Sequence, residues 1–392
     1  MRILLVHQNF PGQFKHLAPA LVAQGHEVVA MGTRPLAQPS GYRYVRWRPR
    51  QATGKDGHPW SRDFDTKVIR AEAAFQAARA LHKDGFVPDV IVAHPGWGEA
   101  MFLKMVWPKA NLGLYCEFYY EPVGPDTYFD PEFPAEDPQF NAAKMRVRNI
   151  ANDFAIEDAV AGIAPTQWQA ARFPEYFRSK ITIVHDGIDT NEIQPNPGVA
   201  LHLSNGLVLT RDDEVVTYVA RNLEPYRGYH VMMRTLPSLM ARRPKAQFLI
   251  VGGAGTSYGR APPDGKSWRE IFFHEVKHDL DLSRLHFLDY LSYDRFQAVL
   301  QASRVHIYLT YPFVLSWSLM EAMATGCAII GSNTEPVAEV IDDGISGKLV
   351  SFFDRSGLGD GVCNFLDDAQ ARKRVGLAAR AKVVTAYDLK TV

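Results

Sequence analysis

The sequence predicts an α/β protein made of two successive doubly wound domains whose ligand-binding edges face one another across a cleft. In both halves of the chain, short apolar runs alternate with segments of helical periodicity, a pattern typical of parallel sheets with crossover helices. The chain has 392 residues, more than one hydrophobic core usually holds. The buried pattern stops near residue 191 and restarts after residue 210, so we predict domains over 1–190 and 211–392 with a linker over 191–210.

In the first half, residues 2–7 form a near-continuous apolar run, as expected of a parallel strand covered on both faces. Further strands are predicted over residues 26–31, 42–47, 87–93, 111–116, 162–165 and 181–185. Apolar residues at helical spacing predict helices over 14–22, 64–83 and 140–160. The first strand, a turn containing Gly12, the first helix and the second strand together form a βαβ unit.

The second half repeats this pattern. Apolar runs predict strands over residues 215–220, 247–251, 285–288, 305–309, 328–331 and 348–350. Helices are predicted directly after Gly228, over 268–279, up to Ala302, up to Thr325 and over 369–386. The helix after Gly228 contains Pro237, at which a kink is expected.

Composition excludes several classes of function. Lys plus Arg and Asp plus Glu number 43 each, so there is no overall basic surface for nucleic acid. The three cysteines are widely spaced and lack the spacing of a metal site. No apolar run approaches the roughly 20 residues of a membrane helix, and the N-terminal run is too short for a signal peptide. We expect a cytoplasmic protein without a bound metal, and we allow for peripheral contact with the inner face of a membrane.

Cationic and small polar residues follow the strands of the second half. Arg221 and Arg227 stand six residues apart in a strand-to-helix loop, from which both could reach one phosphate or diphosphate. Ser316 and Ser318 are candidate N-caps of the helix that ends at Gly326, and a helix N-terminus beside small polar residues suits an anion.

Other residues of the second half complete this hypothesis. Glu321, in the first turns of the helix, suits hydroxyl groups at the edge of an anion pocket, and a glycine-rich turn begins at Gly252. A structural alternative remains open, in which Arg221 pairs with Glu224, Arg227 is solvated and the helix is only a capped crossover.

The first half has a weaker set of candidates. Gly12 would let backbone amides approach a ligand, although, taken alone, a plain tight turn explains it better. His94 follows a strand at the edge where open sheets bind ligands, although it could instead cap the next helix. Glu117 and Glu121 flank three aromatic residues, a combination that suits sugars but also fits an aromatic-lined domain edge.

Five segments of the second half resemble the retaining, nucleotide-sugar-dependent glycosyltransferases of family 4, whose GT-B fold has two Rossmann-like domains. The segments are YVARN (218–222), RG (227–228), FLIVG (248–252), SLMEAMATG (318–326) and EPVAEVI (335–341). The first half agrees more loosely, through FPG (10–12), GHEV (25–28), DVIVAH (89–94) and DGID (186–189). The resemblance covers nearly the whole chain.

The resemblance implies a role for each donor-side candidate. Arg221 would bind the donor diphosphate, and Arg227 stands where the family usually has lysine. Glu321 matches the second carboxylate of the family's Glu-x7-Glu motif and would hold the ribose hydroxyls. The remaining donor contacts would come from Ser316, Trp317, Ser318, Tyr290, Leu291 and Gly252.

On the acceptor side, Gly12 matches the family's glycine loop, and His94 matches the histidine that ends a strand. Glu117 stands where the family often has a polar residue near the reacting sugar. One position departs from the pattern: Phe313 replaces the first carboxylate of the motif, which normally touches the donor sugar. The sugar would then be held differently or be an unusual one, or the activity would be lost.

The sequence therefore predicts an enzyme, a retaining, metal-independent hexosyltransferase. It would move a sugar from a nucleotide-diphosphate sugar, expected to be a UDP- or GDP-sugar, to a hydroxyl acceptor. The acceptor would be a glycan of the cell envelope, a lipid-linked sugar or a natural product, in keeping with polysaccharide biosynthesis. The alternatives are a sugar-nucleotide epimerase of the same architecture and a non-catalytic nucleotide-sugar binding protein.

Overall fold

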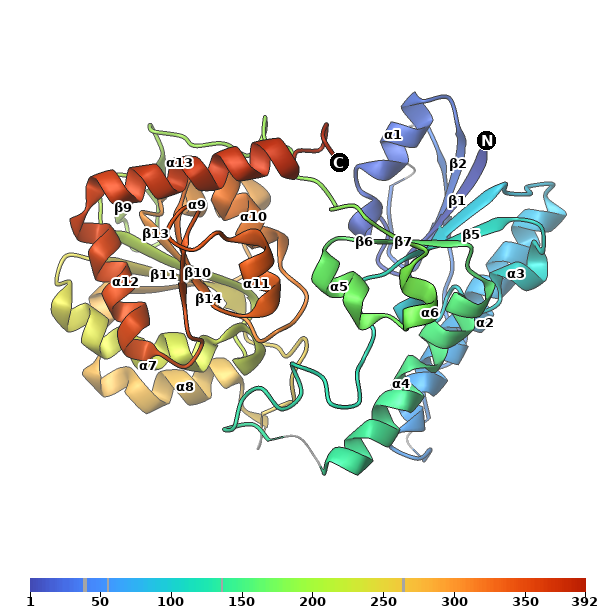
Figure 1. The fold of residues 1–392 in the computed structure, drawn as a ribbon, viewed down its shortest axis with the longest axis horizontal. Helices are drawn as coiled ribbons and strands as arrows, with labels where there is room; N and C mark the ends of the chain where they lie inside the picture. Colours follow the sequence, from blue (N-terminus) through green and yellow to red (C-terminus); the bar gives the residue numbers. More distant parts are fainter. Residues whose placement is uncertain (38–40, 55, 135–136, 263–264) are drawn as a thin grey trace. The chain divides into compact units, whose positions relative to one another are not determined.

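The chain folds into two compact units, Met1–Asp186 and Gly187–Val392. The computed structural model describes residues 1–392 except 38–40, 55, 135–136 and 263–264 (Figure 1). Each unit has its own parallel sheet with helices packed against it, which confirms the predicted class of doubly wound α/β domains. The stretch predicted as a linker, residues 191–210, lies within the second unit.

The first unit is built on a sheet whose described strands run in the order β3-β2-β1-β4-β5-β6-β7, all parallel. The strands are β1 (Arg2–Val6), β2 (Glu27–Gly32), β3 (Arg43–Arg46), β4 (Val90–Ala93), β5 (Asn111–Tyr115), β6 (Ala161–Ala164) and β7 (Ile181–Ile183). The helices are α1 (Leu17–Ala23), α2 (Ser61–Lys83), α3 (Leu103–Val106), α4 (Pro138–Asp158), α5 (Gln167–Arg172) and α6 (Glu175–Arg178), with 3-10 turns η1 (Gly12–Phe14) and η2 (Pro95–Trp97).

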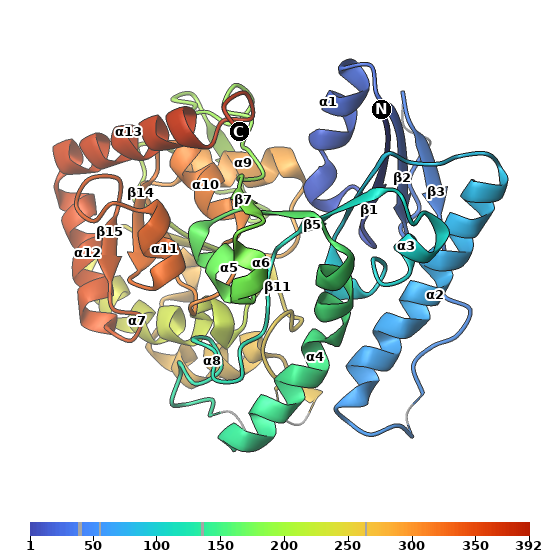
Figure 2. The same ribbon diagram turned by 45° about the vertical axis from the view of Figure 1, so that its right-hand side comes forward.

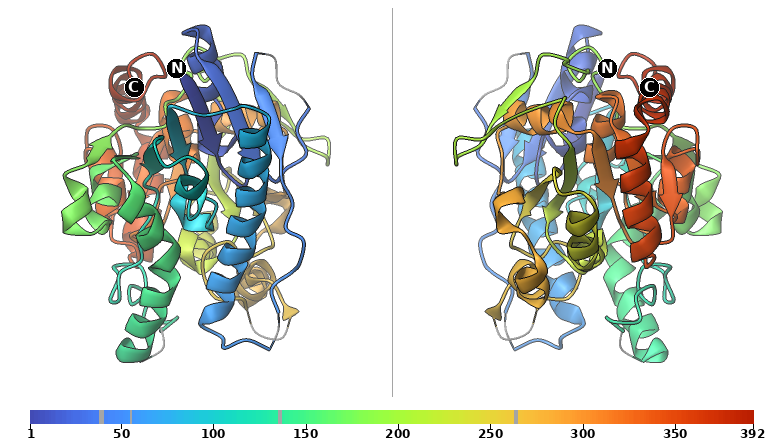
Figure 3. Two further views of the ribbon diagram at one scale, coloured as in Figure 1. Left: turned by 90° about the vertical axis from the view of Figure 1, so that its right-hand side faces the viewer. Right: turned by 90° about the vertical axis from the view of Figure 1, so that its left-hand side faces the viewer.

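Strand β1 is buried on both faces of this sheet. Leu4 and Val6 belong to a core that also contains residues of α2 and α4. Ile3 and Leu5 point to the opposite face, where they pack with Phe10 and with α1. Figure 3 shows α2 (blue) and α4 (green) lying across one face of the unit. Burial on both sides explains why β1 appears in the sequence as one continuous apolar run.

The second unit has a sheet whose described strands run in the order β12-β11-β10-β13-β14-β15, again all parallel. The strands are β10 (Val215–Asn222), β11 (Gln247–Gly253), β12 (Leu285–Leu288), β13 (Val305–Tyr308), β14 (Ala328–Ser332) and β15 (Lys348–Val350). The helices are α7 (Tyr229–Arg242), α8 (Trp268–Val276), α9 (Tyr293–Ala302), α10 (Trp317–Ala324), α11 (Glu335–Val340), α12 (Arg355–Asp367) and α13 (Ala369–Ala386), and η3 (Pro225–Arg227) precedes α7.

Three features of this unit were not predicted, and one of them is α11, a helix of only 6 residues. A hairpin of β8 (Ala200–His202) and β9 (Val208–Thr210) occupies part of the expected linker, and Leu201 and Leu209 pack there against Val215. Each strand has only three residues, too few to show a detectable alternation of apolar and polar side chains in the sequence. Helix α12 was also missed, because its three glycines weaken the helical pattern.

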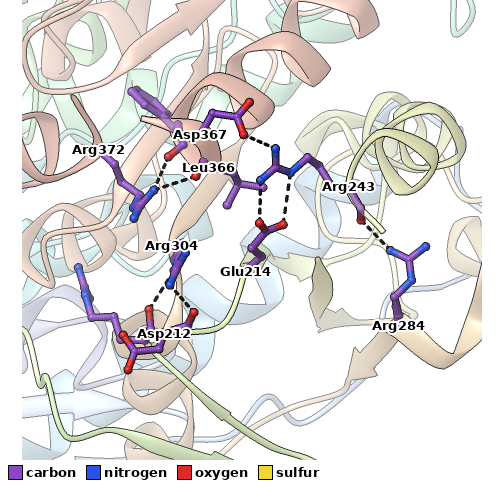
Figure 4. A network of polar contacts seen from close by, with 10 residues as sticks. Asp212, Glu214, Arg243, Arg284, Arg304, Leu366, Asp367 and Arg372 are labelled. Carbon is purple, nitrogen blue, oxygen red and sulfur yellow. Dashed lines mark hydrogen bonds and ion pairs between the residues drawn. The ribbon is translucent and has the colours of Figure 1, made fainter. Parts of the chain in front are cut away.

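Ion pairs and hydrogen bonds connect helices of the second unit with one another and with the amino-terminal edge of its sheet (Figure 4). Arg243, which follows α7, donates to Glu214 at 2.7 Å, just before β10 begins. The same guanidinium donates to Asp367 at the end of α12. Arg372 of α13 donates to the Leu366 carbonyl oxygen at 3.3 Å. These contacts leave the opposite, carboxyl edge of the sheet for ligands.

The strand order reverses at one point in each sheet. In the first unit the chain builds β1, β2 and β3 outward and then returns to place β4 beside β1. The second unit does the same with β10 and β13. Ligands of open α/β sheets bind at such switch points, outside the carboxyl ends of the strands. No helix in the described part of the chain is long and apolar enough to cross a membrane.

Candidate active site

The donor-side candidates of the second unit lie at the carboxyl ends of four neighbouring strands. Arg221 is in the last part of β10, Gly252 in β11, and Tyr290 follows β12. The loop over 309–316 joins β13 to α10, whose first residue is Trp317. The structure therefore places these residues at one edge of one sheet, where the predicted strand ends had put them.

Arg221 is a free cation at this edge. Its side chain is exposed and makes no hydrogen bond or ion pair with any residue that the structure describes. The alternative in which Arg221 pairs with Glu224 is wrong. Glu224 is fully buried, and its carboxylate accepts hydrogen bonds from the amides of Ser257, Tyr258 and Gly259 at 3.1 to 3.2 Å. Burial raises the pKa of Glu224, and the three amides oppose that rise.

Arg227 is buried, so the alternative that it is solvated is also wrong. Its Nη1 donates to Thr310 Oγ1 at 2.9 Å and to the Val314 carbonyl oxygen at 3.0 Å. The guanidinium also lies 4.9 Å from the centre of the Tyr258 ring. Arg227 therefore holds the loop between β13 and α10 in place through these hydrogen bonds. Its side chain does not extend into solvent beside Arg221.

Phe313 belongs to an aromatic cluster that covers Arg227. Its ring centre lies 5.5 Å from that of Tyr226 and 5.0 Å from that of Tyr258, and only 7% of the residue is exposed. The ring is 5.8 Å from the Arg227 guanidinium. In place of the expected carboxylate, this position thus supplies an apolar contact to a buried cation.

The N-terminus of α10 is capped as predicted. Ser316 Oγ accepts from the Ser318 amide at 3.3 Å and from the Ser318 hydroxyl at 2.9 Å. The Ser316 amide itself donates to the Tyr308 hydroxyl at 2.8 Å, which anchors the cap to β13. Trp317, the first helical residue, is 40% exposed.

Glu321 lies on the second turn of α10 and is held by a neighbouring helix. The Tyr293 hydroxyl of α9 donates to Glu321 Oε1 at 2.8 Å. Burial raises the pKa of Tyr293, and the Glu321 carboxylate raises it further, so the phenol remains a donor at neutral pH. This contact fixes one oxygen of the carboxylate.

Asn222 connects the glycine turn after β11 with the segment after β12. Its Oδ1 accepts from the Gly255 amide and from the Tyr290 hydroxyl, both at 3.2 Å. A Cβ at Gly252 would come within 2.5 Å of the Ala220 carbonyl oxygen, so the turn requires glycine there. Tyr290 is 75% exposed, which leaves one face of its ring open to a ligand.

In the first unit, the loop after β1 packs on a buried histidine. Gly12 has φ +47°, and a Cβ there would meet the His7 ring at 2.8 Å. Burial, together with the nearby His94, lowers the pKa of His7 to about 3, so this ring is neutral at physiological pH. Gln13, the next residue of the loop, donates to Glu117 Oε1 at 3.0 Å. The loop is thus fixed to the end of β5.

His94 and Glu117 are brought together as a hydrogen-bonded pair. The Gly96 amide donates to His94 Nδ1 at 3.2 Å, so the ring proton lies on Nε2, which donates to Glu117 Oε2 at 3.0 Å. His94 therefore caps η2, as one alternative expected, and also orients Glu117. Burial would raise the pKa of Glu117, but the hydrogen bonds from His94 and Gln13 and the electrostatic effects of His94 and His7 together outweigh it, so the pKa is lowered.

The aromatic segment after Glu117 is held within the first unit. The Tyr119 hydroxyl donates to Asp153 at 2.7 Å, and the Tyr120 backbone exchanges hydrogen bonds with the Asn149 side chain. Glu121 pairs with Arg172 at 2.9 Å. These contacts fit the alternative of an aromatic-lined edge.

Glu99 is a buried carboxyl group that the sequence did not single out. It is 1% exposed, and neither oxygen has a hydrogen-bond partner among the described residues. Burial raises its pKa to about 7. It stands five residues after His94, and the imidazole of His94 is one of the groups that act on this pKa.

Glu99 predicts a pH dependence of stability. Its pKa rises from 4.5 when unfolded to about 7 when folded, so the folded state holds a proton that the unfolded state has lost between these values. Stability should fall as pH rises through this window, by up to about 3 kcal/mol. Glu99→Gln should match the wild type in urea unfolding at pH 5 and be more stable at pH 8. Equal differences at both pH values would contradict the assignment.

The other residues missed from the sequence are partners of the predicted ones. Tyr293, Asn222 and Thr310 stand 28, 68 and 83 residues from the groups they bind, Glu321, Tyr290 and Arg227. The only available signal was that each follows or opens an element at the carboxyl edge. No local pattern could pair them.

Comparison with known proteins agrees with this geometry. Residues 24–193 match the family described as "Glycosyl transferase family 4 group", and residues 204–382 match "Glycosyl transferases group 1". Glycogen synthase of Mycobacterium tuberculosis is 24% identical over 415 residues, which span 100% of this chain and 92% of that protein.

Two solved structures have the same fold. Sucrose-phosphate synthase from Thermosynechococcus elongatus has a TM-score of 0.74 and 19% identity, over 100% of this chain and 96% of that one. HepE from Anabaena, solved with UDP and glucose, has a TM-score of 0.71 and 15% identity over the same shares. These matches do not favour either alternative, an epimerase or a non-catalytic binder. The chain belongs to the family-4 glycosyltransferases, has their GT-B fold, and transfers a sugar from a nucleotide-sugar donor.

Proposed function

We propose that this glycosyltransferase acts with retention of configuration and without a metal ion, and that its second unit binds the donor. One observation carries the proposal: an unpaired cation, Arg221, lies at the switch point of a sheet beside the strand that leads to the capped N-terminus of α10. A diphosphate placed there would meet a guanidinium and the positive end of the α10 helix dipole.

The proposed reaction needs stabilisation of the leaving group. The bond from the anomeric carbon to the diphosphate oxygen breaks, and the acceptor oxygen bonds to that carbon on the same face. The acceptor proton passes to the departing phosphate oxygen, so the protein supplies no nucleophile. Arg221 and the positive end of the α10 helix dipole would stabilise the charge that develops on the diphosphate, and Arg227 would hold the loop before α10 in place.

Glu321 is proposed to bind the ribose hydroxyls. The hydrogen bond from the Tyr293 hydroxyl to Glu321 Oε1 holds the carboxylate in a fixed orientation at this edge of the sheet. Tyr290 and Leu291 would line the base, with Gly252 allowing close approach of the backbone. We propose a UDP- or GDP-sugar as donor, and the HepE structure with UDP and glucose favours UDP.

Glu321 gives a prediction that separates ribose binding from folding. Wild-type enzyme should discriminate against a 2′-deoxyribose donor by about tenfold in kcat/KM, because a buried carboxylate would lose its donor. The discrimination should disappear in Glu321→Ala and shrink in Tyr293→Phe. Steady-state kinetics with the ribose and 2′-deoxyribose donors measures this discrimination. If it persisted in Glu321→Ala, another residue would be the one that binds the ribose 2′-hydroxyl.

In the first unit, Glu117 and His94 are proposed to lie near the reacting sugar, and the Gly12 loop near the acceptor. The relatives differ in what they make, as the names glycogen synthase and sucrose-phosphate synthase show. The acceptor is therefore proposed only as a hydroxyl compound, in a glycan, a lipid-linked sugar or a small molecule. We also propose a cytoplasmic location with peripheral contact at the inner membrane face, as expected from the sequence.

Product analysis tests the proposal. Purified protein is incubated in EDTA with UDP- or GDP-sugars and a panel of hydroxyl acceptors, and proton NMR reads the anomeric configuration of the product. The proposal expects the configuration of the donor and an unchanged rate in EDTA. An inverted product, or a rate that is lost in EDTA and restored by a divalent ion, would overturn it.

A further inference from the structure

One stretch of this neutral chain is strongly basic. Residues 28–55 contain five arginines and one lysine but no aspartate or glutamate, although acidic and basic residues are equal in number over the whole chain. This stretch spans β2, β3 and the segments that follow them. An ordinary solvated surface of a chain with this composition would not have only positive side chains among its charged residues over 28 positions.

Four of the arginines gather at the carboxyl edge of the first unit's sheet. β2 and β3 lie side by side at one end of the sheet, with Gly32 opposite Arg46 (Figure 2). Arg34 follows β2 by two residues, Arg46 ends β3, and the chain continues to Arg48 and Arg50. All four are exposed.

These arginines lie on the side of the sheet that holds the Gly12 loop. Val45 of β3 packs against the core shared with α2, so Arg46, the next residue of the strand, points the opposite way. That is the face of Tyr44, which stacks on Phe10 at 5.6 Å between ring centres. Phe10 stands two residues before Gly12.

Arg34 is hydrogen-bonded to the segment that leads into the Gly12 loop. Its Nε donates to Asn9 Oδ1 at 3.2 Å. Besides burial and His94, the positive charge of Arg34 helps to lower the pKa of His7, the histidine against which Gly12 packs. The cation is therefore close enough to act on the groups that shape the loop.

No carboxylate in the part of the chain that the structure describes forms an ion pair with these four arginines. Arg48 and Arg50 make no side-chain hydrogen bond with a described residue. Arg46 Nε donates only to the Thr33 carbonyl oxygen, at 2.8 Å. The fifth arginine, Arg43, lies at the other end of β3 and pairs with Asp84 at 3.1 Å.

We propose that Arg34, Arg46, Arg48 and Arg50 form a binding site for a phosphate group carried by the acceptor. The inference rests on the proposed function, because it assigns the phosphate to the molecule whose hydroxyl receives the sugar. Guanidinium groups bind phosphate oxygens in paired hydrogen bonds, and unpaired ones lose no internal ion pair on doing so. The phosphate could belong to a soluble sugar phosphate or to the headgroup of a membrane lipid.

Calorimetry in the presence of saturating UDP, which fills the donor site, tests the proposal. The probes are inorganic phosphate, glucose 6-phosphate and glucose, with flotation on phosphatidylcholine vesicles with and without phosphatidylglycerol as the lipid arm. The double variant Arg48→Gln/Arg50→Gln is compared with Arg43→Gln, which removes an exposed arginine of the same strand at the far end. UDP binding by each protein is measured separately and tests the proposed function on its own.

The proposal expects binding to a phosphate-bearing probe that weakens about tenfold in the double variant and not in Arg43→Gln, with little binding of glucose. Binding of glucose 6-phosphate would assign a soluble acceptor, and binding only to phosphatidylglycerol vesicles a lipid one. No binding by the wild type, or equal binding by the two variants, would overturn it. Failure of UDP to bind would instead count against the donor site.

Discussion

Arg221→Ala is expected to lower kcat/KM about 100-fold without changing stability. Arg221 is exposed and makes no hydrogen bond or ion pair with a described residue, so its loss should leave the fold intact. Its proposed partner is the diphosphate, where negative charge develops during sugar transfer. The loss of one hydrogen-bond donor to such a group lowers the rate about 100-fold or more. Initial rates of nucleotide release, together with thermal unfolding, measure both effects.

Two control variants sharpen this prediction. Arg221→Lys keeps the charge but not the paired donors, so it should recover part of the rate. Arg43→Gln removes an exposed arginine of the first unit and should have wild-type kinetics. An Arg221→Ala enzyme with an undiminished rate would remove Arg221 from the site.

Arg227→Met is expected to lower both stability and activity. The substitution keeps much of the side-chain volume but leaves the Val314 carbonyl oxygen and the Thr310 hydroxyl without their buried donor. Such losses cost about 2 to 3 kcal/mol of unfolding free energy. The loop before α10 would also loosen, so kcat/KM should fall at least tenfold. Urea unfolding and donor kinetics on the same preparation provide the two numbers.

The matched control is Arg242→Met at the end of α7, which breaks an exposed ion pair with Asp360 of α12. Pairs of this kind contribute at most about 1 kcal/mol, and this one is far from the loop in sequence. If Arg227→Met were as stable as Arg242→Met, the bracing role of Arg227 would be wrong.

Strand ends were the most predictable part of the site. A buried parallel strand is an apolar run, and its last residue marks the sheet edge where ligands bind, so Arg221, Gly252 and Tyr290 could be located from the sequence. The direction of a side chain could not. Arg221 and Arg227 look equivalent in sequence, yet a 3-10 turn that ends at Gly228, with φ +72°, carries Arg227 into the interior.

Partners far apart in sequence were the least predictable part. The hydroxyl that fixes Glu321 comes from Tyr293, on another helix, and the carboxylate of Glu224 is satisfied by amides more than 30 residues away. The meaning of Phe313 could not be inferred either, because its neighbours Tyr226 and Tyr258 come from two other loops. Such contacts depend on tertiary packing, which no local period encodes.

Calorimetric titration with UDP and GDP in EDTA tests most directly whether the carboxyl edge of the second unit binds the donor diphosphate. The account predicts binding of at least one nucleotide by the wild-type protein without metal, weakened about tenfold or more in Arg221→Ala and unchanged in Arg43→Gln. No binding of either nucleotide, or equal affinity in the wild type and Arg221→Ala, would contradict it.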